Sequence, residues 1–230
     1  MSTTEIILRF LGAAIAGYLL GSIPSGVLVS RIFGGTDPRT LGSGKTGATN
    51  VLRSLGKGPA AIVVLVDFFK GVAAVLLARF VFFGLIAHVG YSAQTWSTLR
   101  DSAEAVAATC ALLGHNYSIF IRFTGGRGVL TGFGAVTTMS PITTVFALIA
   151  GITPVWLTRY VSLGSVMGAL IAMVTEIYLT ITHVDSLPHC LFVVVGSSVV
   201  IVSHRDNISR LRAGDERKLG EKATPVAQQG

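Results

Sequence analysis

Two long runs without a charged residue limit what this chain can fold into. Phe10 to Ser30 covers 21 residues and Gly128 to Thr158 covers 31, and neither run contains Asp, Glu, Lys or Arg. A transmembrane helix needs about 20 consecutive apolar residues. Only 13% of the 230 residues are charged, whereas soluble domains carry about 25%. The sequence therefore predicts an all-α polytopic membrane protein.

The apolar segments predict seven transmembrane helices. The 31-residue run counts as two spans, because at about 1.5 Å per residue one helix of that length far exceeds a hydrocarbon core of about 30 Å. Pro141 lies in the middle of this run and breaks or kinks a helix; one kinked helix is the alternative. The first run is too long for a signal peptide and lacks a basic segment before it, so we expect it to be retained. The predicted spans lie near residues 8–31, 59–84, 103–121, 126–139, 142–158, 162–183 and 187–203.

The basic residues orient these spans. With seven spans, 14 of the 18 Lys and Arg residues fall on one side, and Lys70 lies inside a span. The other side keeps only Arg9, Arg79 and Arg100. Because cytoplasmic loops are enriched in Lys and Arg, we expect the N-terminus outside and the C-terminus in the cytoplasm. This topology also accounts for the net charge of +7, and a nucleic-acid partner is not needed.

The chain is expected to form one transmembrane domain over residues 1–213, followed by a disordered polar tail over residues 214–230. The two cysteines, Cys110 and Cys190, lie in apolar segments and match neither a disulfide framework nor a metal motif. No Cys/His cluster or carboxylate array indicates a metal site, so we expect neither a metal nor a cofactor.

Residues 42–53, GSGKTGATNVLR, form the strongest candidate for a phosphate site. A Walker A loop is excluded, because that motif needs a glycine at the position of Arg39. Closely spaced glycines still let backbone N–H groups approach an anion. Arg53 can bind a phosphate bidentately. The further donors and the nearby cation of this segment are Ser43, Gly44, Lys45, Thr49 and Asn50.

A second candidate segment precedes the predicted span at 126–139. Glycines directly before a helix expose free N–H groups at its positive end, which favours anions. Arg127 lies within this turn, and His115 precedes it by 12 residues. An ordinary interfacial turn remains the alternative. The glycines of the turn are Gly125, Gly126 and Gly128.

A third candidate segment, HRDNISRL at residues 204–211, follows the last span. On a helix, His204 and Asn207 share one face and can point at one site. Asp67 and Lys70 are three residues apart inside a span and can pair, because charges within the membrane face a partner or a cavity. Glu176 is alone in its span, and we expect it to reach the outer interface. In the seven-span topology all three motif segments emerge on one side, as an anionic substrate presented next to lipid requires.

These motifs occur in an order that resembles one known family. GSGKTGATNVLR at 42–53, DFFKG at 67–71, GH at 114–115, GGRGV at 125–129, RYVSL at 159–163 and HRDNISRL at 204–211 follow one another along the chain. The chain resembles the bacterial acyl-phosphate:glycerol-3-phosphate acyltransferase family, PlsY, from about residue 18 to residue 212. The family commonly has Asn where Lys45 stands and Lys where Arg127 stands; both residues here keep or add positive charge.

The resemblance implies a seven-helix enzyme of the inner, or cytoplasmic, membrane with its active site facing the cytoplasm. Such an enzyme transfers a fatty acyl group from a long-chain acyl phosphate to the 1-hydroxyl of glycerol 3-phosphate. The products are lysophosphatidic acid and phosphate, the first step of phospholipid synthesis. The expected partners are these two substrates, membrane lipids, and a soluble phosphate acyltransferase that supplies the donor.

Taken together, the motifs and the resemblance define a candidate site. The expected catalytic residues are Ser43, Arg53, His204 and Asn207. The expected phosphate- and substrate-binding residues are Gly44, Lys45, Thr49, Asn50, Gly125, Gly126, Arg127, Gly128 and Ser162. The expected supporting residues are Asp67, Lys70 and His115. A phosphate-ester transporter and a membrane phosphatase using His115 or His204 are the rival functions that the residues alone leave open.

Overall fold

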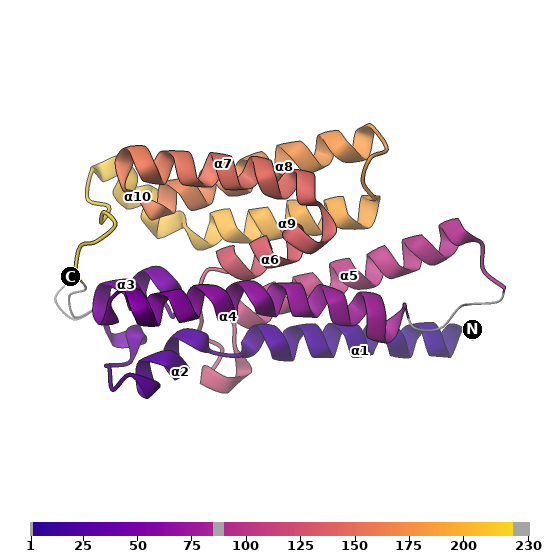
Figure 1. Cartoon of the computed structure of the whole chain (residues 1–230), viewed down its shortest axis with the longest axis horizontal. Helices are drawn as coiled ribbons and strands as arrows, with labels where there is room; N and C mark the ends of the chain where they lie inside the picture. The colour runs from indigo at the N-terminus through magenta and orange to yellow at the C-terminus, as the bar shows by residue number, and fades with distance from the viewer. Residues whose placement is uncertain (1, 85–89, 223–230) are drawn as a thin grey trace.

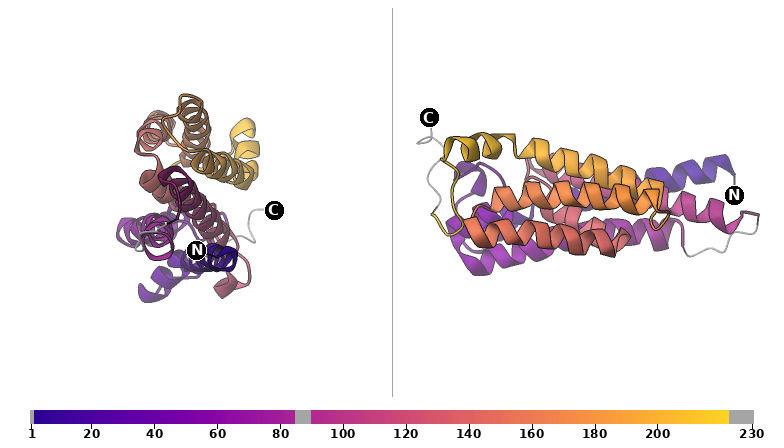
Figure 2. Two further views of the ribbon diagram at one scale, coloured as in Figure 1. Left: turned by 90° about the vertical axis from the view of Figure 1, so that its right-hand side faces the viewer. Right: turned by 90° about the horizontal axis from the view of Figure 1, so that it is seen from above.

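The structure, a computed structural model, describes residues 2–84 and 90–222, and every regular element in these ranges is a helix. This confirms the all-α prediction. The long helices lie roughly along the longest axis of the molecule (Figure 1), and Figure 2 shows α6 between a group formed by α7–α9 and a group formed by α1–α5. The long helices are α1 (Thr3–Ser22), α4 (Lys57–Leu76), α5 (Ala93–Asn116), α6 (Val129–Met139), α7 (Pro141–Thr158), α8 (Val161–Ile181) and α9 (Leu187–Ser203).

Short helices gather at the end of the molecule opposite the N-terminus (Figure 1). They are α2 (Ser25–Ile32), α3 (Ala48–Leu55) and α10 (Arg205–Ala213). Pro24 separates α1 from α2, because proline lacks the N–H that would continue the helix. At the other end of the chain, α10 bends away from α9 by 52° at His204. These breaks place three motif segments at the same end of the bundle.

The helix boundaries follow the predicted spans with two differences. The helix predicted at 103–121 is α5, which begins ten residues earlier, where Ser92 caps it by accepting a hydrogen bond from the N–H of Thr95. The helix predicted at 59–84 is α4, which continues into a π-helical turn, η2 (Leu77–Phe82). Pro141 separates α6 from α7, so the 31-residue run forms two helices.

Not all of these helices have the length and composition of a membrane span. Within the described residues, four helical segments pass on both counts, and a fifth passes if α9 and α10 count as one bent span. The helix α6 has only 11 residues, and α5 carries Arg100, Asp101 and Glu104 in its first half. The number of seven spans therefore remains a prediction. The four segments are Thr3–Ile32, Lys57–Phe82, Pro141–Thr158 and Val161–Ile181.

Glycines and alanines bring α1 and α5 into close backbone contact. A Cβ atom at Gly17 would overlap the carbonyl oxygen of Ala107, and one at Gly21 would overlap that of Ala111. Residues four apart on a helix lie on the same face. Small residues at this spacing are typical of helix pairs in membranes, where van der Waals packing replaces the hydrophobic effect. The contact fixes α5, and with it His115, against α1.

We expect Gly21→Val to destabilise the protein by about 1–3 kcal/mol, because the new side chain has no space beside Ala111. The measurement is the thermal midpoint of the purified protein in detergent. Leu19→Val on the exposed face of α1 is the control. An unchanged midpoint in Gly21→Val would contradict the close contact.

Candidate active site

A polar cavity of about 280 Å³ lies where α3, α4, α6, α8 and α10 meet. All three motif segments contribute to its wall. Most of the predicted site residues line it, whereas Gly44, Lys70, Gly125 and Gly126 are not part of the lining. The predicted residues in the wall are Ser43, Lys45, Thr49, Asn50, Arg53, Asp67, His115, Arg127, Gly128, Ser162, His204 and Asn207.

The N-terminal ends of three helices, α3, α6 and α8, face this cavity. The first turn of α3 contributes Ala48 and Thr49, that of α6 contributes Val129, and that of α8 contributes Val161 and Ser162. The first N–H groups of a helix have no acceptor within the helix, and each N-terminus carries a partial charge of about +0.5. The cavity is therefore suited to an anion before any side chain is counted.

Two half-buried arginines add full charges to these helix ends. The Arg53 side chain donates to the carbonyl oxygen of Arg217 over 3.1 Å, and Arg127 Nε donates to that of Ser203 over 3.1 Å. Burial lowers the pKa of both guanidinium groups from the ordinary value, yet arginine stays charged at neutral pH. Arg53 Nε has no hydrogen-bond partner among the described residues. A buried donor without a protein partner in a cationic cavity is available to hydrogen-bond an anion.

Asn50 holds the first motif loop together. Its side-chain nitrogen donates to the carbonyl oxygens of Pro38 (2.6 Å), Leu41 (3.0 Å) and Lys45 (2.8 Å), and its oxygen lies 3.4 Å from the N–H of Ser43. The sequence predicted Asn50 as a phosphate donor; in the structure its amide donates to these carbonyl groups, so contact with a phosphate remains a prediction. Its role is to shape the loop that presents Ser43 and Lys45.

His204 lies directly beyond α9 and is 3% exposed. Its Nδ1 donates to the carbonyl oxygen of Val200 over 2.8 Å, because a carbonyl can only accept. This tautomer leaves Nε2 as an acceptor. Burial, together with the charge of Arg127, lowers the pKa of His204 to about 4. The ring is therefore neutral at physiological pH and is a weak base.

Asn207 is held by a carboxylate that the sequence analysis missed. Its Nδ2 donates to Glu216 Oε1 over 2.6 Å, and Ser162 Oγ donates to the same oxygen over 2.8 Å. Arg210 Nε donates to Glu216 Oε2 over 2.8 Å. Burial alone would raise the pKa of Glu216, but the hydrogen bonds from these three residues lower it. Asn207 Oδ1 remains without a partner among the described residues.

The position of Glu216 corrects the expected disorder of the tail. Residues 214–222 return across the end of the bundle: the N–H of Leu219 donates to the carbonyl oxygen of Arg159, the Arg159 side chain donates to the carbonyl oxygen of Leu219, and the Arg53 side chain donates to that of Arg217. The polar composition of the segment suggested a solvated tail, but Glu216 and the carbonyl group of Arg217 bond to residues of the cavity wall. Residues 223–230 lie outside the described residues.

A buried cluster of charged and polar side chains lies at the wall of the cavity around Asp67. Lys70 Nζ lies 2.8 Å from Asp67 Oδ1, so the pair expected from their spacing is present. Ser25 Oγ donates to the same carboxylate over 2.6 Å, and His115 Nδ1 lies 3.5 Å from it. These residues come from α2, α4 and α5. The cluster therefore links α2, α4 and α5 next to the polar cavity.

The glycine turn before α6 packs on His115. A Cβ atom at Gly126 would overlap the imidazole ring, and one at Gly125 would overlap the carbonyl oxygen of the same residue. Gly128, the N-cap of α6, has a φ of 77°, a conformation that costs other residues about 1–2 kcal/mol. Gly125 and Gly126 thus serve close packing, and Gly128 lets the chain turn so that α6 points its N-terminus at the cavity.

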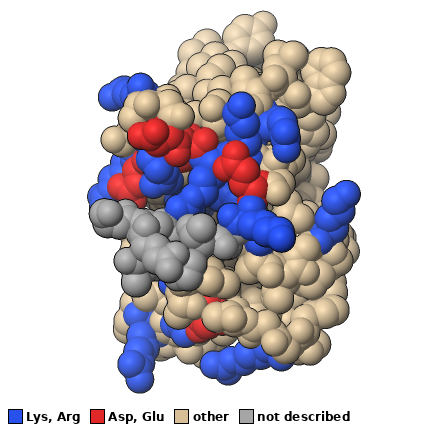
Figure 3. All heavy atoms as spheres, turned by 90° about the vertical axis from the view of Figure 1, so that its left-hand side faces the viewer, with Lys and Arg blue, Asp and Glu red and all other residues tan. Residues whose placement is uncertain are grey.

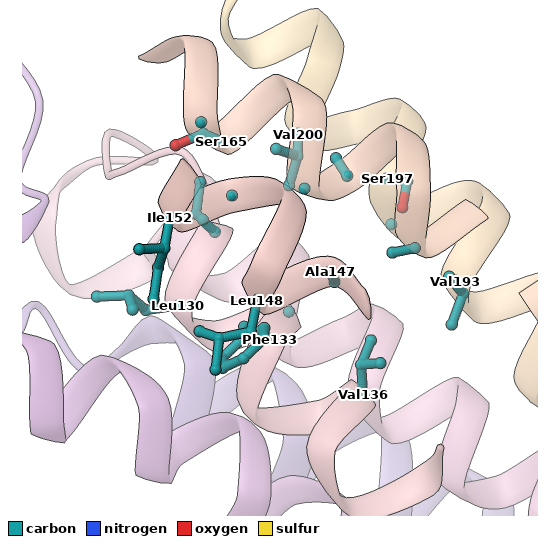
Figure 4. A pocket seen from close by; sticks show the side chains of 18 of the residues that line it. Leu130, Phe133, Val136, Ala147, Leu148, Ile152, Ser165, Val193, Ser197 and Val200 are labelled. Atoms are coloured by element: carbon teal, nitrogen blue, oxygen red, sulfur yellow. The ribbon is translucent and has the colours of Figure 1, made fainter. Parts of the chain in front are cut away.

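A second, apolar cavity of about 250 Å³ lies next to the polar one, between α6, α7, α8 and α9. Figure 4 shows Leu130, Phe133 and Val136 of α6 facing this space together with residues of the other three helices. We call it the apolar groove. It shares four wall residues with the polar cavity, namely Val129, Leu130, Val161 and Ser165. A ligand with a charged head and a hydrocarbon tail would fit both spaces at once.

Lys and Arg side chains gather around this end of the molecule (Figure 3). Several acidic side chains lie among them on the same face. A field of net positive charge attracts anionic ligands to the opening of the polar cavity.

The family model described as glycerol-3-phosphate acyltransferase matches residues 11–214. The chain belongs to this family. It is 42% identical to glycerol-3-phosphate acyltransferase 1 of Deinococcus radiodurans over 212 residues, which cover 92% of this chain and 96% of that one. It is 43% identical to the glycerol-3-phosphate acyltransferase of Thermus thermophilus over 205 residues, which cover 89% and 92%.

Solved structures agree with this assignment. The glycerol 3-phosphate form of PlsY (YgiH), an integral membrane glycerol 3-phosphate acyltransferase, superposes with a TM-score of 0.77 at 32% identity, covering 92% of this chain and 96% of that one. The lysophosphatidic acid form of the same protein gives a TM-score of 0.75 at 31% identity, covering 92% and 95%. The chain is thus a multi-pass membrane enzyme of the PlsY type, and the resemblance seen in the sequence is confirmed.

We expect the pH dependence of acyl transfer to show no step between pH 6 and 8 that belongs to His204, because its pKa is lowered to about 4. The measurement is kcat/KM against pH for the wild type and for His204→Gln. The variant should be slower, with a profile of the same shape over this range. A step near pH 6.5 that disappears in His204→Gln would instead identify His204 as the base.

Proposed function

We propose that this acyltransferase takes its acyl group from a long-chain acyl phosphate. The 1-hydroxyl oxygen of glycerol 3-phosphate forms a bond to the acyl carbon, and the bond from that carbon to the phosphate oxygen breaks. Inorganic phosphate leaves with the bonding electrons, and the product is lysophosphatidic acid. The hydroxyl proton passes to an oxygen of the departing phosphate, so no covalent enzyme intermediate forms.

One observation carries this proposal: the cationic cavity shares part of its wall with the apolar groove. The four shared wall residues place the groups expected to bind phosphate next to the groups expected to bind hydrocarbon. An acyl phosphate has this polarity, with a dianionic head and an apolar tail. Glycerol 3-phosphate brings a second phosphate to the same cavity, which the helix N-termini, Arg53 and Arg127 can neutralise.

The same groups can stabilise the transition state. Negative charge grows on the acyl oxygen and on the leaving phosphate as the hydroxyl attacks. N–H groups and guanidinium groups that are already fixed by packing need no reorganisation at that moment. Among the described residues that line the cavity, Arg53 Nε and Asn207 Oδ1 are the buried side-chain atoms without a hydrogen-bond partner, so both can bind substrate. We assign Arg53 and Arg127 to the phosphates, and Ser43 and Asn207 to orientation of the glycerol hydroxyl.

The proton acceptor follows from the state of the histidines. His204 is neutral with a lowered pKa, which makes it a weak base. Nδ1 of His115 lies 3.5 Å from Asp67 and 3.2 Å from Thr131 Oγ1. A phosphate monoester has a second pKa of about 6. The oxygen of the substrate phosphate is therefore the better acceptor, and His204 positions the reactants.

We further propose that the active site faces the cytoplasm in the inner membrane. The support is the gathering of Lys and Arg at the end that holds the polar cavity (Figure 3), as cytoplasmic ends of membrane proteins require. The seven long helices then act as spans, with the N-terminus outside. The donor would be supplied from the cytoplasm by a soluble phosphate acyltransferase.

The proposal predicts which donor the enzyme uses. Purified protein is given glycerol 3-phosphate with either palmitoyl phosphate or palmitoyl-CoA, and both inorganic phosphate and lysophosphatidic acid are measured. We expect equal amounts of both products from palmitoyl phosphate only. Arg53→Ala should reduce kcat/KM by at least about 100-fold, because it removes a charged donor from the transition state.

The matched control is Arg39→Ala. Arg39 lies in the same loop, but it pairs with Asp37 at 2.7 Å and does not line the cavity. Near-normal turnover is expected for this variant. Phosphate release without lysophosphatidic acid would point to a phosphatase. Transfer from palmitoyl-CoA at the same rate would contradict the proposed donor.

A further inference from the structure

The apolar groove ends against a layer of buried polar side chains. One helical turn beyond Ala147 and Ala172, Thr143 Oγ1 donates to Glu176 Oε2 over 2.6 Å and links α7 to α8. Glu176 is fully buried. The sequence analysis expected this residue to reach the outer interface, but its partner on α7 holds it inside the bundle.

A second part of the same layer lies beyond the α9 wall of the groove. His189 is one turn from Val193, and its two ring nitrogens lie 2.9 Å from Asp185 and 3.2 Å from Glu104. Arg79 binds the Glu104 carboxylate with two hydrogen bonds of 2.8 and 2.9 Å. A hydrocarbon end that entered this layer would strip these charges of their partners, at a cost of several kcal/mol.

The α6–α7 junction closes the remaining side. These two helices join at Ser140, and the groove residues nearest the junction are Val136 on α6 and Ala147 on α7. Val136 and Ala147 belong to the main apolar core together with Phe192 and Val193. The groove therefore has a packed floor with a polar layer behind it.

The depth of the groove can be read along α8. From Val161, which also lines the polar cavity, to Ala172 is 11 residues, or about 16 Å at 1.5 Å per residue. With C–C bonds of about 1.5 Å, an extended chain advances about 1.3 Å per carbon. The groove thus holds about twelve carbons.

Two glycines keep the groove wide at different depths. A Cβ atom at Gly132 would meet only Leu112, at 3.8 Å, and one at Gly196 would come no closer than 3.5 Å to Leu112 and Phe192. Both are ordinary van der Waals distances, so neither glycine is required by helix packing. Gly132 lies one turn into α6, about 6 Å past Gly128, whereas Gly196 lies about 12 Å before His204 on α9.

We propose that the apolar groove limits how many carbons of the substrate's acyl chain are bound. Gly132 and Gly196 leave the groove wide enough for the chain, and the Thr143–Glu176 layer sets its depth. This inference rests on the proposed function, because it takes the groove to hold the acyl tail of the donor. The first twelve or so carbons are bound, and carbons beyond them contribute no further affinity.

The test measures binding of n-alkyl phosphates from butyl to hexadecyl phosphate to the full protein in detergent. Each buried CH₂ contributes about 0.8 kcal/mol, or about fourfold in affinity. In the wild type the affinity should rise by this factor up to about twelve carbons and then level off. It should level off near nine carbons in Gly196→Leu and near five in Gly132→Leu.

Ser198→Leu, on the exposed face of the same helix α9, is the matched control and should follow the wild type. The affinities of the variants and the wild type are compared at each chain length, because partition of the probe into detergent is then the same for every protein. Equal binding of butyl phosphate shows that the polar cavity is intact. If a leucine variant no longer binds butyl phosphate, Gly132→Ala and Gly196→Ala, whose Cβ atoms fit, replace the leucine variants. The chain length at which affinity levels off must then fall by less, and it must fall further in Gly132→Ala than in Gly196→Ala.

A common levelling point in all four proteins would overturn the proposal, as would affinity that rises through hexadecyl phosphate in the wild type. The binding test is independent of catalysis. If n-alkyl phosphate binding levels off but palmitoyl phosphate gives no acyl transfer, only the proposed donor is refuted. If acyl transfer occurs but binding does not level off, only the role of the groove in limiting chain length is refuted.

Discussion

The structure depends on placing several positive ends of helices around one cavity in a chain that is otherwise apolar. The N-termini of α3, α6 and α8 face the same space, and Arg53 and Arg127 lie half-buried beside them. Like charges brought together out of water repel strongly unless an anion balances them. The cluster is tolerable because Glu216 supplies one carboxylate, and the phosphate groups that we propose for this cavity would balance the remaining charge.

Polar groups mark both ends of the space in which the acyl chain is proposed to lie. At one end lies the cationic cavity, which we propose binds the reacting phosphate; at the other, Glu176, His189 and their partners form a buried polar layer. Between them the wall is apolar and contains glycines that packing does not demand. The bundle thus combines a site for charge with a slot for hydrocarbon, which a reaction between a water-soluble and a lipid-like substrate needs.

Sequence reasoning found the helices and most of the cavity because both depend on local patterns. Apolar runs, Pro24 and Pro141 determine where helices end, and the three motif segments each carry their own glycines or cations. It did not reveal the hydrogen-bond partners of several polar residues. The amide of Asn50 donates to carbonyl groups of its own loop, which the motif alone does not show. Glu216 was placed in a solvated tail because no local pattern reveals that Asn207 and Ser162 lie above it. Glu176 was misplaced for the same reason, since Thr143 is 33 residues away.

The central claim is that two half-buried arginines and the helix N-termini form a phosphate site. Calorimetric titration of glycerol 3-phosphate into the purified wild type, Arg53→Gln, Arg127→Gln and Arg39→Gln tests it most directly. The account predicts one site in the wild type and in Arg39→Gln, with affinity lower by at least about tenfold in the other two variants, since a lost charged hydrogen bond costs about 1.5–3 kcal/mol. Unchanged affinity in both Arg53→Gln and Arg127→Gln would contradict it.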